Sequence, residues 1–340
     1  MDRHPHQFDG DSASQLGRSL AYLPGAPRPI LAAGAPGYTD SGRDSAGAVR
    51  LFVLRTDGTV HKQKWLTQNS AGVPGKSEHD DYFGWSLAST GKALVVGAPF
   101  EDIGSVSDAG QATLLYRTGQ LTFTGRAIHQ NSAGVPDKAQ RYDNFGYSVA
   151  AGLKTIAIGV PNESFGSIKG AGAVQPFRYR GGTKISAWSL RHQNYPGIPG
   201  SNESYDGWGM SVAMVRPCAG KTGIVVGAPN EDVGLAVDSG AAALVTLNGG
   251  ASCKSKSLAQ GGALGDSAED YDYAGTTVGI QRTSTKANAT DGIVVGITGE
   301  DNYRGRATFI NKPYTTAATT VSYEGFNDFD WFGGGLNTPR

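Results

Sequence analysis

Residues 78–117 read EHDDYFGWSLASTGKALVVGAPFEDIGSVSDAGQATLLYR, and related stretches occur four more times along the chain. The related stretches begin near Gln15, Arg141, Ser204 and Tyr271. Consecutive copies are 67, 62, 63 and 66 residues apart, as measured between the anchoring glycines Gly17, Gly84, Gly146, Gly209 and Gly275. A fixed period of this size is typical of tandem structural units packed round or along an axis. The repeat therefore decides the fold, although it does not decide the function.

Each copy contains four short segments with the character of β-strands. In the second copy, FGWSLAS alternates between apolar and polar residues, ALVVGA is continuously apolar, and QATLLYR alternates again. A further run, such as RAIHQ at 126–130, precedes the next copy. Short runs of this kind bounded by Gly, Pro, Asp and Asn are strand signals. Four antiparallel strands per repeat and no helical periodicity predict an all-β protein, a β-propeller with one sheet per repeat.

The repeats divide the chain into five predicted blades within a single domain, residues 1–340. The blades occupy about 8–67, 68–130, 131–193, 194–260 and 261–324, and a tail occupies 325–340. Within the tail, Phe332-Gly333 resembles the start of a sixth copy that never reaches its GAP. We therefore favour five blades, with six or seven as the alternative. The FG and GAP glycines are expected to permit close strand packing or unusual backbone angles near the axis.

The amino-acid composition limits the kinds of partner that we expect for this protein. Lys plus Arg and Asp plus Glu both total 30, so no global charge attracts nucleic acid. No run of 18 apolar residues is present, so we expect no membrane-spanning helix. The N-terminal MDRHPHQFDG is not a signal peptide, and an exported protein would have lost its leader. The two cysteines, Cys218 and Cys253, could pair in an exported protein or remain as free thiols.

The repeated residues resemble a known family. Phe83-Gly84 and Phe145-Gly146, followed by VVGAP at 95–99 and 225–229, are similar to the FG-GAP repeat of integrin α-chain propellers. Bacterial integrin-like proteins and a fungal propeller lectin resemble this build. The resemblance covers about residues 8–310, and we expect a secreted, extracellular protein, with a cytoplasmic location as the alternative. The family is functionally mixed, so the resemblance predicts the fold more strongly than the activity.

The resemblance also raises the question of calcium, which integrin-like repeats usually hold in a D-x-D-x-D-G loop between the first two strands. The corresponding loops here read LPGAPRP, STGK, AGLK, RPCAGKTG and QRTSTKANATDG, in which only Asp291-Gly292 matches. We therefore expect no calcium site of the family type, no cofactor and no metal ligand. Calcium at other carboxylates is the alternative, because clustered carboxylate and carbonyl oxygens are the ligands that Ca²⁺ takes.

One face of the predicted disc collects acidic and aromatic side chains. An antiparallel meander places the connectors before each FG and the loops after each GAP at the same edge of every sheet. The connectors at 68–81, 130–143 and 193–206 are near copies, which exceeds what turn formation demands. We predict that this face binds a carbohydrate or protein ligand through Asp81, Tyr82, Glu101, Asp102, Tyr142, Asp143, Glu163, Tyr205, Asp206, Glu231 and Asp232. Turn formation and capping by the carboxylates is the structural alternative.

Signatures of catalysis are weak in this sequence. G-x-S-x-A occurs at 17–21, 84–88, 146–150 and 209–213, and four copies at one blade position indicate structure rather than a nucleophile elbow. The six histidines have no metal-ligand spacing. We therefore predict a binding module. The alternative function is an enzyme of the hydrolase, lyase or cyclase type with an active site in the central funnel, whose catalytic residues are unknown.

Overall fold

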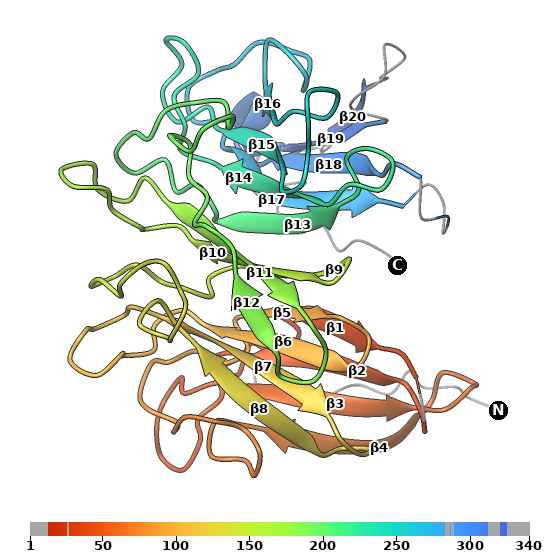
Figure 1. The fold of residues 1–340 in the computed structure, drawn as a ribbon. Coiled ribbons are helices and arrows are strands. Elements are labelled where there is room, and N and C mark those ends of the chain that lie inside the picture. Colours follow the sequence, from red (N-terminus) through yellow and green to blue (C-terminus); the bar gives the residue numbers. More distant parts are fainter. Residues whose placement is uncertain (1–12, 26, 283–285, 287–288, 312–319, 325–340) are drawn as a thin grey trace.

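The computed structural model describes residues 13–25, 27–282, 286, 289–311 and 320–324. Within them, twenty strands form five sheets, each made of four consecutive antiparallel strands (Figure 1). The all-β propeller fold predicted from the repeat is confirmed. The predicted tail at 325–340, with the suspected start of a sixth copy, lies outside the described residues.

Each blade follows the chain in order, from an inner strand to an outer one. Blade one contains β1 (Leu20–Leu23), β2 (Ile30–Ala35), β3 (Ala48–Leu54) and β4 (Val60–Leu66). Blade two contains β5 (Ser86–Ser89), β6 (Ala93–Ala98), β7 (Gln111–Arg117) and β8 (Phe123–Ile128). Blade three contains β9 (Val149–Gly152), β10 (Thr155–Val160), β11 (Ala173–Tyr179) and β12 (Ile185–Ala187). Blade four contains β13 (Ser211–Val215), β14 (Gly223–Ala228), β15 (Ala241–Thr246) and β16 (Lys256–Ala259). Blade five contains β17 (Ala274–Gln281), β18 (Gly292–Ile297), the short helix α1 (Glu300–Tyr303), β19 (Arg306–Ile310) and β20 (Thr320–Glu324).

The inner strands surround a central cavity of about 510 Å³. Its lining comes from the first strand of every blade and includes Leu20, Leu87, Val149, Met214 and Ile280. Successive inner strands also pack on one another from β1 through to β17. The five sheets are therefore blades arranged round one axis, and their inner strands β1, β5, β9, β13 and β17 lie toward the middle of Figure 1.

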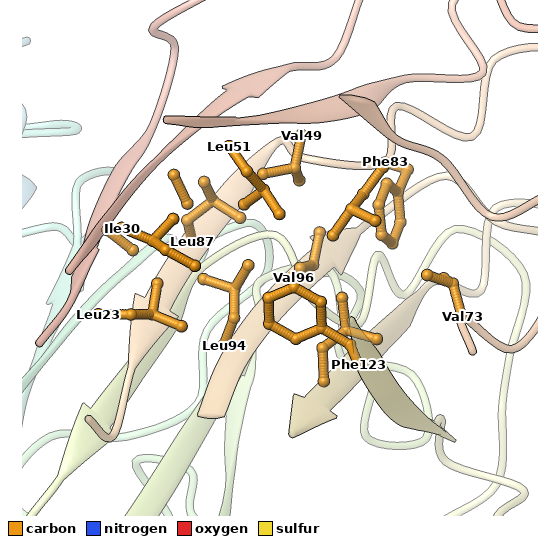
Figure 2. Packing of buried hydrophobic residues seen from close by; sticks show 14 of the residues in the cluster. Leu23, Ile30, Val49, Leu51, Val73, Phe83, Leu87, Leu94, Val96 and Phe123 are labelled. Carbon is orange, nitrogen blue, oxygen red and sulfur yellow. The ribbon is translucent and has the colours of Figure 1, made fainter. Parts of the chain in front are cut away.

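The hydrophobic core lies between blades rather than within one sheet. Blades two, three and four each have a neighbouring blade on both faces of the sheet, so the second strand of such a blade, for example β6, is buried at all six positions. This explains why the sequence there is continuously apolar. Figure 2 shows the seam between blades one and two, where Ile30 and Leu51 of one blade meet Phe83 and Leu94 of the next. Equivalent clusters fill the seams 2/3, 3/4 and 4/5.

The FG and GAP glycines meet each other across every one of these seams. The FG glycine Gly146 has a φ of +96°, a conformation that side chains rarely adopt. A Cβ on the GAP glycine Gly97 would overlap with the carbonyl oxygen of Gly146. The same contact joins Gly34 to Gly84, Gly159 to Gly209, and Gly227 to Gly275. The structure thus confirms both expected roles, close packing and unusual backbone angles.

Blade four carries a disulfide bond between Cys218 and Cys253, which resolves the alternative left open by the sequence. Cys218 lies between β13 and β14, and Cys253 lies between β15 and β16. The bond therefore joins two loops at the same end of one sheet. No free cysteine is found, since the chain has only these two.

Candidate functional site

The connectors before FG and the loops after GAP lie together, and backbone hydrogen bonds join them across the seams. In the seam between blades two and three, Tyr142 N donates to Ser107 O (3.1 Å) and Phe145 N donates to Ala109 O (2.9 Å). Bonds equivalent to that of Tyr142 join Asp80 to Asp44, Tyr205 to Lys169, and Tyr271 to Val237. We name the surface formed by these connectors and loops the loop face.

The aspartate of each connector is buried beneath the loop face. Asp143 is 1% exposed, and its Oδ2 accepts a hydrogen bond from the backbone N–H of Gln140 at 2.6 Å. It stands between two residues of positive φ, Tyr142 (70°) and Asn144 (58°). A residue other than glycine with a positive φ destabilises the folded state by about 1–3 kcal/mol. The hydrogen bond of the aspartate helps to hold the backbone in this strained conformation. The same arrangement recurs at Asp81, Asp206 and Asp272.

The glutamate of each post-GAP loop is held by a glutamine from the preceding connector. Gln130 Nε2 donates to Glu163 Oε2 at 2.5 Å, and both side chains are 1% exposed. The equivalent pairs are Gln68–Glu101 (2.5 Å), Gln193–Glu231 (2.5 Å) and Gln260–Glu300 (2.7 Å). Every seam from 1/2 to 4/5 therefore contains one Gln, one Asp and one Glu of this kind, all of them buried except the half-buried Glu231. We name these three residues the seam triad.

Burial and mutual repulsion raise the pKa values of the acids in the seam triads, in several of them to neutral pH or above. Removal from water raises the pKa of Glu101 to about 8, and the adjacent Asp81 carboxyl adds to this shift. The pKa of Asp81 is raised to about 7, mainly by burial. Burial likewise raises the pKa values of the other triad acids, to about 7 for Asp143, 9 for Glu163, 6 for Asp206, 7 for Glu231 and 8 for Glu300.

The predicted ligand residues therefore separate into two groups. The structure buries Asp81, Glu101, Asp143, Glu163 and Asp206, and half-buries Glu231 and Tyr82. It exposes Tyr142, Tyr205, Asp102 and Asp232. Asp102 and Asp232 also accept the backbone N–H groups of Asp108 and Asp238, both at 2.9 Å, which is the turn-forming role considered as the alternative.

Tyr82 is not the structural equivalent of Tyr142. Blade two carries Asp80 at the position of Tyr142, and Tyr82 follows Asp81 instead of preceding it. Its ring packs edge-on against Phe100 (5.2 Å between centroids) and lies 6.0 Å from Trp85. Counting back from each FG glycine would have revealed this offset in the sequence.

Sequence reasoning left two exposed features of the loop face out of the predicted set. Tyr271 is 47% exposed at the position of Tyr142 and Tyr205, and its place in the repeat was a sufficient signal. Beside it, Leu235 is 99% and Val237 is 44% exposed in the post-GAP loop of blade four. The equivalent positions of blades two and three are Ser105 and Ser107, and Ser167 and Lys169, so no repeated pattern marked these two residues.

The inner end of the loop face carries a small aromatic cluster near the axis. Trp85 and Tyr147 occupy the second position of G-x-S, and their ring centroids are 5.3 Å apart. The guanidinium of Arg18, from the same position in blade one, lies 4.3 Å from the centroid of Trp85. Most of the side chains that line the central cavity are apolar. Its described lining includes Tyr22, Ser89 and Arg282 as polar side chains but no carboxylate or histidine.

The seryl groups of the G-x-S-x-A stretches face the seams and have a structural partner. Ser86 Oγ donates to the carbonyl oxygen of Gly146, and Ser148 Oγ donates to that of Gly209. Ser19 and Ser211 make the same bond to Gly84 and Gly275. These four equivalent hydrogen bonds support the interpretation that the G-x-S-x-A stretches have a structural role.

Comparison with known proteins agrees with this architecture. The FG-GAP repeat family model matches residues 73–114, which include Phe83-Gly84 and the GAP triplet of blade two. No curated protein matches the chain significantly. In the described part of the chain, no helix is long and apolar enough to cross a membrane.

Proposed function

Because this chain is a β-propeller built from FG-GAP repeats, we propose that it acts as a binding module that recognises a carbohydrate or protein ligand on its loop face. The observation that carries the proposal is the recurrence of exposed tyrosines in successive seams. Tyr142 is 51%, Tyr205 is 67% and Tyr271 is 47% exposed, all at the same position of the repeat.

Burial in the core does not account for these tyrosines. A buried ring contributes to the core, but an exposed ring contributes little, and its backbone here has a positive φ of 66–73° that disfavours a bulky residue. Tyrosine is enriched where proteins contact ligands, because it combines a rigid apolar ring with a hydroxyl group. Strained residues on a surface are also found preferentially at functional sites. The three rings therefore fit a role in ligand contact.

Within this proposal the exposed acids and the buried acids have different roles. The exposed Asp102 and Asp232 lie on the loops beside the tyrosines and offer carboxylate oxygens to hydroxyl or amide groups. The buried Asp81, Asp143 and Asp206, with Glu101, Glu163 and Glu231, hold the connectors in position beneath the ligand. Rigid support of this kind lowers the entropic cost of binding.

Two features favour an extracellular location for this function. FG-GAP propellers are typical of extracellular proteins, and the Cys218–Cys253 bond is of the kind that persists in oxidising compartments. Catalysis in the central funnel is the competing function. The described lining of the cavity offers Tyr22, Ser89 and Arg282, but no acidic or histidyl partner for acid–base chemistry, so binding is the better supported reading.

The proposal can be tested on immobilised glycans and on candidate partner proteins. The triple variant Tyr142→Ala/Tyr205→Ala/Tyr271→Ala should lose binding while its melting temperature stays close to that of the parent, because the three rings are exposed. A matched control, Lys92→Ala/Lys154→Ala, changes turns at the opposite end of the blades and should bind like the parent. Equal binding by the triple variant would overturn the proposal. Turnover of a substrate that an Arg282→Ala variant abolishes would favour the enzyme.

A further inference from the structure

The charges of this protein are separated between its two ends, although they cancel in total. We name the end opposite the loop face the turn face. It is formed by the loops that join the first strand of a blade to the second and the third strand to the fourth. The described residues of these loops carry eleven lysines and arginines but only two acids, Asp57 and Asp291. The connectors and loops of the loop face between residues 36 and 305 carry 22 acids and 7 lysines or arginines. The turn face is therefore a basic surface on a neutral chain.

Every blade places a basic residue in the turn between its first two strands. Because the first strands line the central cavity, these turns surround the mouth of that cavity on the turn face. The five residues are Arg28, Lys92, Lys154, Lys221 and Arg282. With the described residues, none of the five forms an ion pair. Their charges are therefore available to an anion from outside the chain.

Two of these charges are neighbours at the cavity mouth. Arg282 follows β17 of blade five and lines the cavity. A Cβ built on Gly152, the last residue of β9 in blade three, would lie 4.0 Å from its Nη2. Lys154 is only two residues further along the chain. One anionic group at the mouth can therefore meet side chains from two blades.

Positive charge also accumulates at the turn-face end of blade one. The pKa of His61 is lowered by desolvation and by three nearby positive charges, those of Arg28, Arg55 and Lys62. Asp57 is the one acid in the two turns of this blade. It accepts hydrogen bonds from the N–H group (2.9 Å) and the hydroxyl (2.7 Å) of Thr59, so its role is to form the turn.

Lys154 stands at a position where the fold favours a different residue. Leu153 and Lys154 form the two-residue turn between β9 and β10, and their φ values are +51° and +59°. A hairpin turn with positive φ at both positions favours asparagine and glycine, because bulky side chains rarely adopt this conformation. Strained residues cluster at functional sites. A contact with a ligand therefore explains this exposed lysine better than turn formation does.

The basic loops of blades four and five are held rigidly. The Cys218–Cys253 bond joins the two turn-face loops of blade four. Arg216 is 5% exposed, and its Nε donates a hydrogen bond to Asp291 Oδ1 at 3.0 Å. Its Nη1 donates to the carbonyl oxygen of Lys286 at 2.7 Å, which joins the loop of blade four to that of blade five. Loops fixed in this way lose little freedom when a ligand binds.

We propose that the turn face is a second binding surface, separate from the loop face, which takes an acidic polysaccharide through the basic residues of the five inner turns. Arginine and lysine pair with sulfate and carboxylate groups, and a linear polymer can contact several turns at once. The disulfide bond is of a kind found in extracellular proteins, which favours a polysaccharide over a nucleic acid. The described turn-face loops expose no large hydrophobic side chain, whereas membrane-surface sites combine basic residues with apolar ones.

Binding to immobilised dextran sulfate and to immobilised alginate tests the proposal, with neutral dextran as the blank. The variant Lys92→Gln/Lys154→Gln/Lys221→Gln/Arg282→Gln should bind about tenfold more weakly or worse, because several weak charge pairs are lost together. Its binding should also depend less steeply on salt. The matched control Arg43→Gln/Lys76→Gln/Lys138→Gln/Lys169→Gln removes as many lysines and arginines from the loop face and should bind like the parent. Binding of either polymer supports the proposal, and the polymer that binds identifies the anionic group.

Two further variants separate the turn face from folding and from the loop face. Lys154→Gly should raise the melting temperature, because it relieves the strained turn, and yet weaken binding to dextran sulfate by about twofold to fivefold. It still decides if the fourfold variant does not fold. The variant Tyr142→Ala/Tyr205→Ala/Tyr271→Ala should bind dextran sulfate like the parent, so the result does not depend on the function of the loop face.

Three results would overturn the proposal. The first is an equal loss of binding in the fourfold variant and its matched control, which would reduce the effect to net charge. The second is no binding of either polymer by the parent at about 50 mM NaCl, where charge contacts are weakly screened. The third is tighter binding to phosphatidylserine vesicles or to DNA than to both polymers, which would assign the turn face to a different partner.

Discussion

The hydroxyl of Ser86 donates a hydrogen bond to the carbonyl oxygen of Gly146, 2.8 Å away in the next blade. This single contact joins two parts of the repeat that the sequence presents separately. The serine belongs to the G-x-S stretch of blade two, and the glycine belongs to the FG pair of blade three. Gly97 of the GAP triplet packs against the same carbonyl group. The repeated residues therefore stabilise the contact between neighbouring blades. The serine and the GAP glycine of one copy contact the carbonyl group of the FG glycine in the next copy.

Removal of the Ser86 hydroxyl should weaken one seam by a measurable amount. A net hydrogen bond contributes about 0.5–1.5 kcal/mol, and Ser86→Ala also leaves the carbonyl of Gly146 with one partner fewer. We expect the free energy of unfolding in urea to fall by about 1 kcal/mol. The control Ser105→Ala, in an exposed turn, should not change it. Equal stability of the two variants would show that the seam does not depend on this bond.

The FG glycine should tolerate a side chain far less well than a glycine of similar φ elsewhere. Gly84 has a φ of +95° and a Cβ there would overlap with Ala48 O, whereas Gly104 has a φ of +68° and open space around it. Gly104→Ala should cost about 1–2 kcal/mol of backbone strain. Gly84→Ala should cost roughly 2–4 kcal/mol, the range of severe lesions. Urea unfolding of both variants measures the difference, and similar values would place Gly84 away from a seam.

The sequence was informative where one residue type repeats at one position. It predicted the five sheets found in the described residues, the inner strand after each FG, the buried second strand and the loop face, because these follow from strand period and turn residues. It also indicated that G-x-S is structural. The burial of Asp81 and Glu101 could not be deduced, because whether an acid on a loop points to solvent or into a seam depends on the neighbouring blade. The ion pair between Asp266 and Arg306 could not be deduced either, because it depends on the register in which β19 pairs with β18.

Raising the pH should destabilise the protein through the seam triads. In the folded state the pKa of Glu101 is raised to about 8, mainly by burial, whereas in the unfolded chain the ordinary pKa of about 4.5 applies. Unfolding therefore releases a proton between these pH values, so stability declines as pH rises through this range. Glu101→Gln copies the protonated acid. It should match the parent near pH 4.5 and be more stable above about pH 8 in thermal unfolding. A parent that gains stability relative to this variant as pH rises would contradict the argument.

The disulfide bond should contribute substantially to the stability of blade four. Cys218 and Cys253 are 35 residues apart, and the loop-entropy relation gives about 4 kcal/mol for a closed loop of that length. Reduction of the parent, or the variant Cys218→Ser/Cys253→Ser, should lower the urea midpoint. The reductant should have no effect on the variant, which serves as its control. An unchanged midpoint after complete reduction would mean that the loops are held by other contacts.

The exposed tyrosines should act as separate, equivalent sites rather than as one. Tyr142, Tyr205 and Tyr271 lie in three different seams, so one small ligand does not need to contact all three. Tyr205→Ala should therefore reduce the number of monovalent ligands bound per chain by about a third and leave their Kd unchanged. On a surface carrying many ligands, avidity multiplies the effect, and the same substitution should weaken apparent affinity by about tenfold or more. Equilibrium titration with a soluble ligand and binding to the coated surface give the two quantities. If Tyr205→Ala instead changes the Kd of the monovalent ligand at full stoichiometry, the tyrosines form a single shared site.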